Sequence, residues 1–245
     1  MKTPFSPEEN FYSQNFATTP CLPDNTTKMD FLYGKRYFIC DKSLNLDSPI
    51  SKNLIVELGC GDAKRLLYLK HKYDFKNAVG IDLGFSDEQH VESSIFKSCN
   101  LNNDWPFDDG TVDVLIAMML FEHLFDPFFS FKETARVLDI DGRAFINLPL
   151  VTSAKNRLRL LVGLIPVTSV PYSRWETERH WDGFHLHYFT LSSIHDLARN
   201  AGLSVVSIHG VGAMKKLKDL MPTLLCGEIS FEVRKLDKEK NETQP

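Results

Sequence analysis

The stretch Leu54-Ile-Val-Glu-Leu-Gly-Cys-Gly-Asp62 decides the fold. Its apolar start predicts a buried strand over Leu54–Glu57, and its two glycines predict a tight turn. The amphipathic segment Ala63–Tyr73 predicts a helix directly after that turn. About twenty residues further on, a second short strand, Ala78–Asp82, ends in an acid, as in βαβ units that bind a nucleoside. The glycines let the backbone approach a nucleoside and the acid can hold its ribose hydroxyls, so the stretch outlines a cofactor pocket.

The rest of the chain continues this alternation of strands and helices, which indicates a parallel sheet with helices on both faces. Further strands are expected over Ile95–Cys99, Val112–Met118, Ala144–Leu148, Leu203–Ile208 and Ile229–Arg234. A turn is expected at Asp139–Gly142, directly before the strand at Ala144. Helices are expected over Asp87–Ser94, Asp126–Leu138 and Leu191–Ala201, the last with Thr190 as N-cap and Gly202 after its end.

Composition excludes several classes of protein. The 245 residues are 43% hydrophobic and 24% charged, and the formal net charge is −4, so no basic face is expected and nucleic acid is not an expected partner. The five cysteines are scattered and form no Cys-x-x-Cys pair, which argues for a reducing compartment and against disulfides or a structural zinc. The polar start Met1–Asn15 and the broken apolar run Leu160–Val170 predict no secretion signal and no membrane span. A cytoplasmic location is therefore expected.

Three regions follow from these patterns. Residues 1–50 are expected to form an N-terminal arm, in which Phe31–Asp41 is either a docking helix or a cover for the pocket. Residues 51–235 form the main domain, and residues 236–245 form a charged tail. Residues 151–189 interrupt the alternation with a basic and apolar stretch, Lys155–Leu164, and an aromatic, histidine-rich loop, so this insertion is expected to form a lid over an acceptor.

With these residues in place, the chain resembles class I S-adenosylmethionine-dependent methyltransferases of the methyltransferase-11/23 type over roughly Ser51–Arg234. The resemblance rests on the order and separation of five motifs: Glu57-Leu-Gly59-Cys-Gly61, Asp82, Trp105-Pro-Phe-Asp-Asp109 with Val112-Asp-Val114, Glu122-His-Leu-Phe-Asp-Pro127, and Glu133-Thr-Ala-Arg-Val-Leu138. The insertion, with Asn156–Gly163 and Pro171–Thr177, is similar to the MetW-like branch of methionine biosynthesis.

The resemblance implies a Rossmann-like, seven-stranded α/β sheet whose last strand is antiparallel, flanked by helices. On its own the glycine turn allows a nicotinamide, a flavin or a sulfonium nucleoside, and the later motifs select S-adenosyl-L-methionine. The residues that the resemblance assigns to this cofactor are Glu57, Gly59, Cys60, Gly61, Asp82, Leu83, Asn100, Leu101, Met118 and Glu122. Two positions depart from the family pattern, since Asn100 stands where an acid often meets adenine and Ala63 replaces a frequent third glycine.

Several of these residues have two possible roles. Glu57 either orients the glycine turn or contacts the methionine amino group, and Asp62 either caps the first helix or touches the ligand. His123 is the candidate catalytic base for an alcohol or amine acceptor, or else it packs and anchors the following loop.

The acceptor side of the site is expected in the insertion. The candidate acceptor residues are Trp175, Trp181, His185 and His187. The spacing of His180, His185 and His187 matches no zinc pattern, so these histidines are interpreted as part of the lid and no metal is expected.

The sequence thus predicts methyl transfer from S-adenosylmethionine to a small-molecule acceptor. The alternative is an accessory protein with the methyltransferase fold that binds a partner enzyme of methionine biosynthesis.

Overall fold

The computed structural model describes residues 35–45, 50–83, 95–169, 182, 185–211 and 215–236. The helix predicted at Asp87–Ser94, the arm before residue 35 and most of the histidine-rich loop lie outside the described residues. Within the described part of the chain, no helix has both the length and the apolar character needed to cross a membrane.

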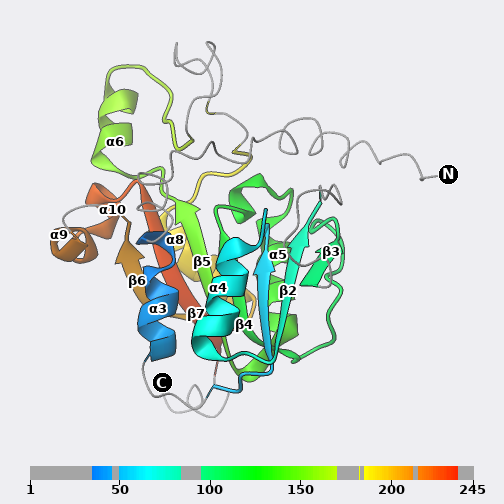
Figure 1. The fold of residues 1–245 in the computed structure, drawn as a ribbon. Coiled ribbons are helices and arrows are strands. Elements are labelled where there is room, and N and C mark those ends of the chain that lie inside the picture. Colours follow the sequence, from blue (N-terminus) through cyan, green and yellow to red (C-terminus); the bar gives the residue numbers. More distant parts are fainter. Residues whose placement is uncertain are drawn as a thin grey trace, which may run out of the picture.

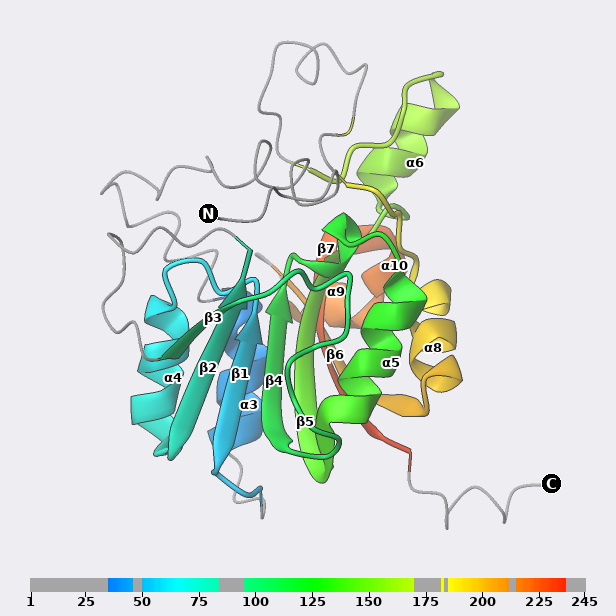
Figure 2. The ribbon, with the colours of Figure 1, turned by 90° about the vertical axis from the view of Figure 1, so that its right-hand side faces the viewer.

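One sheet organises the described chain, with the strand order β3-β2-β1-β4-β5-β7-β6 (Figures 1 and 2). The first five strands pair in parallel, and β7 is antiparallel to both β5 and β6. This arrangement confirms the predicted fold class. The strands are β1 (Leu54–Leu58), β2 (Asn77–Asp82), β3 (Phe96–Ser98), β4 (Val112–Met118), β5 (Leu138–Pro149), β6 (Leu203–Gly210) and β7 (Glu228–Lys235).

Helices cover both faces of the sheet. On one face, α3 and α4 pack beside each other, and on the other face α5 packs beside α8 (Figures 1 and 2). The bounds are α3 (Phe38–Asn45), α4 (Lys64–Tyr73), the 3-10 turn η2 (Phe121–His123), α5 (Pro127–Val137), α6 (Ala154–Leu161), α8 (Leu191–Asn200), α9 (Lys215–Leu220) and α10 (Pro222–Leu225). The short helices α9 and α10 are not predicted from the sequence.

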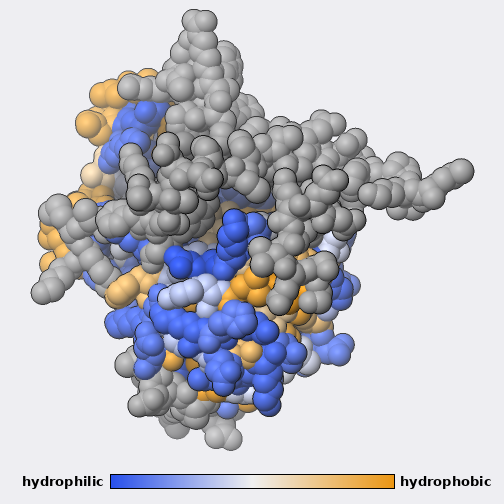
Figure 3. All heavy atoms as spheres, viewed as in Figure 1, coloured by the Kyte–Doolittle hydropathy of each residue, from blue (hydrophilic) through white to orange (hydrophobic). Residues whose placement is uncertain are grey.

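The sheet is buried on both faces because its central strands are apolar at consecutive positions. In β1, Ile55 points toward Leu66 and Leu69 of α4, whereas Val56 belongs to the core that contains Phe131 of α5. Outside this core, hydrophilic side chains cover much of the surface over α4, and the exposed apolar side chains of α6 lie apart from them (Figure 3). Because the sheet is packed on both faces, its strands are held in place, and the loops of the site emerge from the ends of these strands.

The predicted helix ends have the expected chemistry. The Asp126 carboxylate accepts hydrogen bonds from the backbone N–H groups of Phe128 and Phe129, which caps α5. Thr190 and Ser193 form a reciprocal capping box at the start of α8. Gly202 follows α8 with a φ of 77°, which confirms its predicted place after the helix.

The prediction of a turn at Asp139–Gly142, ahead of the strand, is wrong in its placement. These residues lie inside β5, which begins at Leu138 directly after α5. Val112 pairs with Leu138 and Val114 pairs with Arg143, so the extra residues bulge out of β5. The chain folds back so tightly there that a Cβ atom on Gly142 would lie 2.9 Å from the carbonyl oxygen of Val112. Gly142 therefore marks a bulge within the strand and not a turn before it.

Two acid motifs of the sequence have structural roles. The Arg136 guanidinium pairs with Glu133 and donates to the carbonyl oxygens of Trp105 and Phe107, while Glu133 Oε2 accepts a hydrogen bond from the Trp105 N–H. Asp113 Oδ2 accepts hydrogen bonds from the backbone N–H groups of residues 53 and 54, which ties the start of β4 to the start of β1. The Asp113 contacts therefore hold the end of the sheet opposite the glycine turn, and the Arg136 contacts hold the loop that precedes β4.

Replacing Arg136 by Met should lower the free energy of unfolding by about 2 kcal/mol. The substitution keeps most of the side-chain volume but leaves the buried Glu133 carboxylate and the Trp105 and Phe107 carbonyls without their charged donor. Urea denaturation measures the change. Lys132→Met is the matched control, because it removes one exposed charge from the same helix and should change stability by less than about 0.5 kcal/mol. Equal effects of the two substitutions would contradict the role given to Arg136.

Candidate functional site

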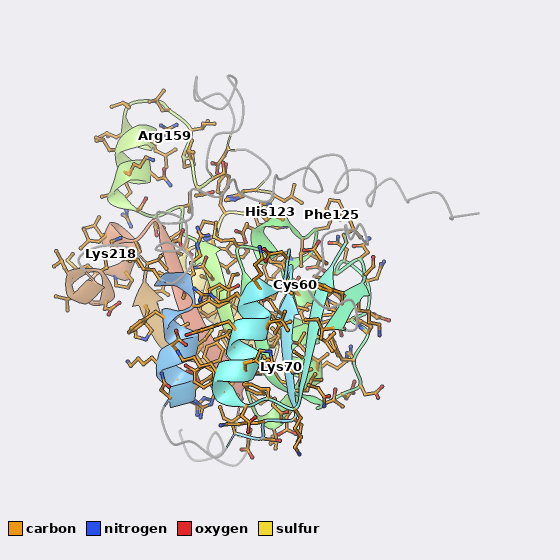
Figure 4. All side chains as sticks on the ribbon, in the orientation of Figure 1. Cys60, Lys70, His123, Phe125, Arg159 and Lys218 are labelled. Carbon is orange, nitrogen blue, oxygen red and sulfur yellow. The ribbon has the colours of Figure 1, made fainter. Side chains whose placement is uncertain are left out.

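The site lies where the strand order reverses between β1 and β4. Strands β1 and β4 are neighbours at the centre of the sheet. β2, which follows β1 in the chain, lies on the far side of β1, and β5, which follows β4, lies on the far side of β4. Loops at the carboxyl ends of these two central strands diverge, and such a switch point is where α/β sheets bind ligands. Cys60, after β1, and His123, after β4, both lie toward this edge, and Lys70 lies toward the opposite end of α4 (Figure 4).

The loop after β1 is a left-handed turn held against β2. Gly59 and Gly61 have φ values of +66° and +52°, a region that L side chains rarely adopt. The backbone N–H groups of Gly59 and Cys60 both donate to the carbonyl oxygen of Ile81, at 2.7 and 3.1 Å. A Cβ atom on Gly61 would meet no atom of the described residues within 4 Å, which leaves room beside this glycine for a ligand.

The same turn is in contact with the loop after β4. A Cβ atom on Gly59 would lie 3.1 Å from Cδ1 of Leu120, which immediately precedes η2. Ala63, where the family often has glycine, has a φ of +51° and is buried, so an alanine holds a left-handed conformation at the start of α4. Cys60 lies between the two glycines with its thiol buried, and burial raises the pKa of that thiol well above its ordinary value.

Asp82 is oriented by two backbone N–H groups. Its Oδ2 accepts from Gly61 at 3.0 Å, and its Oδ1 accepts from Leu83 at 2.7 Å. Each carboxylate oxygen can accept more than one hydrogen bond, so both oxygens can also receive donors from a ligand. Asp82, which is predicted to hold the ribose, is therefore fixed beside the glycine turn.

Glu57 is buried at the end of β1 and receives a hydrogen bond from the Tyr37 hydroxyl, which lies in the segment leading into α3. Burial raises the pKa of the Glu57 carboxyl to about 7, against the opposing effects of the Tyr37 hydrogen bond and the Arg65 charge. Its second oxygen has no hydrogen-bond partner among the described residues. That oxygen is thus available to a ligand or to the turn, which leaves both predicted roles open.

The predicted adenine residues lie in a tight turn after β3. The Asn100 side-chain oxygen accepts from the backbone N–H and the side-chain amide of Asn102, at 3.1 and 3.0 Å. Leu101 is buried, and its carbonyl oxygen accepts a hydrogen bond from the Trp105 indole. Met118, at the end of β4, packs partly buried against the core on the α3–α4 face.

Glu122, His123 and His185 come together in a partly buried cluster. The Glu122 side chain is fully buried, its Oε1 lies 3.9 Å from Nε2 of His123, and neither oxygen has a hydrogen-bond partner among the described residues. Burial raises the pKa of the Glu122 carboxyl to about 8. The rings of His123 and His185 are perpendicular, with centroids 4.9 Å apart. The sequence pattern misses this cluster because 62 residues separate the histidines.

The lid segment reaches the cluster through backbone and side-chain bonds. The N–H of Leu186 donates to the carbonyl oxygen of Glu122 at 2.8 Å. Nε2 of His187 lies 2.9 and 3.1 Å from the carbonyl oxygens of Leu124 and Phe125, so His187 anchors the loop after η2. His185 and His187 therefore have different surroundings, although only one residue separates them. The other predicted acceptor residues, Trp175 and Trp181, and also His180, lie outside the described residues.

Comparisons with known proteins agree with this fold. Residues 33–208, more than half of the chain, match the family described as "Methyltransferase domain". A geranyl diphosphate C-methyltransferase from Streptomyces coelicolor, solved with Mg²⁺, geranyl diphosphate and S-adenosyl-L-homocysteine, is 13% identical with a TM-score of 0.60, covering 95% of this chain and 100% of that one. An S-adenosylmethionine-dependent methyltransferase from Mesorhizobium loti is 12% identical with a TM-score of 0.56, covering 83% and 100% of the two chains.

A third similar structure is a complex of the Haloferax volcanii Trm112 methyltransferase activator with a methyltransferase. It is 14% identical with a TM-score of 0.56, covering 86% of this chain and 93% of that one. The chain belongs to the methyltransferase domain family, and the protein is an S-adenosylmethionine-dependent methyltransferase. The similarity of the insertion to the MetW-like branch and the partner enzyme of methionine biosynthesis are not shown by these comparisons and stay predictions.

The described residues fit this cofactor. Gly61 faces open space beside the fixed carboxylate of Asp82, and the second oxygen of Glu57 is buried without a partner at the same strand ends. These residues would hold the ribose and the methionine part, and the turn at Asn100 and Leu101 would meet the base.

Replacing Asp82 by Ala should weaken the binding of S-adenosyl-L-homocysteine by about 1–3 kcal/mol, because a charged hydrogen-bonding group is lost. Isothermal titration calorimetry measures the affinity. Asp141→Ala is the control: this exposed residue lies in the part of β5 beside the start of β4, at the end of the sheet opposite the glycine turn, so its loss should leave the affinity nearly unchanged. Unchanged binding by Asp82→Ala would remove this residue from the ribose site.

Replacing Glu57 by Gln should stabilise the protein increasingly as the pH rises from 4.5 to about 7. The unfolded chain releases the Glu57 proton near its ordinary pKa of 4.5, whereas the folded chain keeps it until about pH 7. The folded state therefore binds more protons in this window, and this carboxyl lowers the free energy of unfolding as the pH rises through it. Glutamine has no such proton, so Glu57→Gln should gain on the order of 1–3 kcal/mol by pH 8.

Urea denaturation of both proteins between pH 4.5 and 8 checks this expectation. Tyr37→Phe, which removes the donor that favours the ionised carboxylate, should extend the loss of stability to higher pH. A constant difference between wild type and Glu57→Gln across the whole range would contradict the assignment.

Proposed function

We propose that the protein methylates a small-molecule acceptor whose reacting atom lies against the Glu122–His123–His185 cluster, and that His123 accepts the proton that this atom loses. The observation that carries the proposal is the contact between the two loops at the switch point. Leu120, which a Cβ atom on Gly59 would approach to 3.1 Å, is only two residues from the buried Glu122 carboxyl, which has no hydrogen-bond partner among the described residues. The glycine turn and the proton-accepting cluster therefore adjoin each other.

Bound S-adenosylmethionine supplies an electrophilic methyl group on a sulfonium. The chain has two tasks in this chemistry, which are to hold the acceptor in line with that methyl group and to receive a proton if the acceptor is an alcohol or an amine. Glu57, Asp82 and Asn100 fix one side of the site, as described above. The other side is formed by η2 and by the lid segment around His185.

His123 suits the role of proton acceptor for two reasons. Its side chain is 21% exposed, so a ligand can reach it, whereas Glu122 beside it is fully enclosed. The pKa of Glu122, raised by burial to about 8, keeps that carboxyl largely protonated at neutral pH, so it does not compete for the acceptor proton. An imidazole titrates near neutral pH and can take up and release a proton within one catalytic cycle.

The candidate acceptor residues of the lid favour a small molecule as the methyl acceptor. His185 lies in the cluster itself, and the bond from Leu186 to Glu122 holds the lid segment directly over η2. We assign Trp175 and Trp181 to the remainder of this lid on the sequence pattern alone. An aromatic and imidazole lid favours an acceptor with a flat or apolar body and a single reactive polar atom.

Replacing His123 by Ala should lower kcat for methyl transfer about 100-fold while leaving the affinity for S-adenosyl-L-homocysteine nearly unchanged. Wild-type protein is first incubated with methyl-deuterated S-adenosylmethionine and a fractionated extract of small metabolites, and mass spectrometry identifies the labelled product. The variant is then assayed on that acceptor.

His195→Ala, on α8, is the control, because the His195 side chain lies beside Arg199 and the start of β6 at Leu203 and Ser204. If wild-type protein bound the cofactor but labelled only protein or nucleic acid, the small-molecule proposal would be overturned. If His123→Ala kept full activity on an alcohol or amine, His123 would not be the base.

A further inference from the structure

The Glu122–His123–His185 cluster has the composition of a metal site. Each of these three described residues offers one ligand atom, and the three atoms lie within 4.8 Å of one another. Two imidazoles and one carboxylate are a common ligand set for divalent transition metals. The Glu122 side chain is 0% exposed, and neither of its oxygens has a hydrogen-bond partner among the described residues. A buried polar group in this state is costly unless something binds it.

The spacing in the cluster is slightly wider than that of ligands around one ion. Glu122 Oε1 and His123 Nε2 are 3.9 Å apart, which is too long for a hydrogen bond. Two ligands that each lie about 2.1 Å from a shared ion are separated by at most about 4.2 Å. The 3.9 Å gap falls within this limit, whereas a separation of up to 4.8 Å exceeds it, so the side chains would have to move closer together to bind one ion.

The surroundings of His185 set its tautomer. Thr168 Oγ1 donates to Asp182 Oδ2 at 2.7 Å and lies 2.7 Å from Nδ1 of His185. Because the single hydroxyl proton of Thr168 points to the Asp182 carboxylate, Nδ1 of His185 must carry the hydrogen and donate it to Thr168. The other ring nitrogen, Nε2, then presents a lone pair. A metal-binding imidazole is usually held in this way by a carboxylate or hydroxyl behind it.

We propose that Glu122, His123 and His185 together bind one divalent transition-metal cation, with Thr168 and Asp182 as positioning residues behind His185. Three protein ligands leave at least one coordination position open, as in catalytic rather than structural metal sites. Nitrogen ligands favour Zn²⁺ or Co²⁺ over Mg²⁺, which prefers an all-oxygen, octahedral shell. The open position would accept an oxygen or nitrogen atom of the acceptor.

This inference deepens the proposed function and shares His123 with it. An imidazole whose lone pair binds a cation cannot accept a proton. In the metal-bound protein, the cation would instead promote loss of the acceptor proton, because it would lower the pKa of the acceptor atom bound to it. The inference rests on the proposed function only for this role. The existence of the site is tested by binding alone, so the two proposals can fail separately.

The experiment measures metal binding by full-length protein that carries no polyhistidine tag. The protein is stripped with EDTA, dialysed separately against ZnCl₂, CoCl₂, MnCl₂ or MgCl₂, and analysed by inductively coupled plasma mass spectrometry. We expect one Zn²⁺ or Co²⁺ per chain and no retained Mg²⁺. The visible absorption spectrum of the Co²⁺ form should report nitrogen and oxygen ligands without a thiolate band.

Variants then locate the site. Glu122→Gln and His185→Ala should each lower the affinity for Zn²⁺ at least 10-fold. Thr168→Val, which removes the hydroxyl that holds the His185 ring, should lower it about 10-fold. His71→Ala, at an exposed position near the end of α4, is the control and should change nothing. Far-ultraviolet circular dichroism and a cooperative urea denaturation curve for every variant verify that each one is folded.

Two results would overturn the metal site. One is a wild-type protein that retains no transition metal while it still binds S-adenosyl-L-homocysteine. The other is metal binding that survives in both Glu122→Gln and His185→Ala. Methyl transfer by metal-free protein would support His123 as the base and show that the reaction does not require the cation. Metal binding without any methylated small molecule would support the site and contradict the proposed function.

Discussion

The structure depends on one point of attachment, where the turn after β1 is bonded to the end of β2. The carbonyl oxygen of Ile81 receives two N–H groups of the turn, and the Asp82 carboxylate receives a third. These bonds require left-handed backbone at Gly59 and Gly61, and they bring Leu120 of the neighbouring loop against the turn. Because both central strands end here, the cofactor residues and the cluster at η2 are positioned by the same attachment.

Much of the fold follows from local sequence signals. The apolar strands, the caps at Asp126 and Thr190 and the glycine at 202 each act within a few residues, so their effects can be predicted without the tertiary structure. The bulge at Gly142 was not predictable in form, since a glycine after a helix equally suits a turn or a bulge. The helices α9 and α10 are too short for an apolar period to reveal them.

The candidate site divides in the same way. The cofactor side is built from contiguous motifs, and Asp82 lies where the motif predicts, next to Gly61. The acceptor side is assembled from distant segments, so the chain spacing of His185 and His187 gave no hint that only the first would meet His123. Other motif residues have roles in the scaffold: Asp113 joins two strands, and Arg136 holds the loop at Trp105. A motif can thus identify a family through residues that never approach its ligand.

The contact between Tyr37 and Glu57 bears on where an independently folding unit can begin. The helix α3 precedes the sheet, yet its segment supplies the donor to Glu57, and Arg36 forms a two-pronged pair with Glu228 at 2.8 and 2.9 Å. Ser43 in turn accepts a hydrogen bond from the buried Arg143 of β5. A protein that began at residue 51 would keep every strand but would leave Glu57, Arg143 and Glu228 without these partners. Residues 35–45 are therefore part of the packed core. The smallest part of the chain that can fold independently includes this segment as well as the sheet.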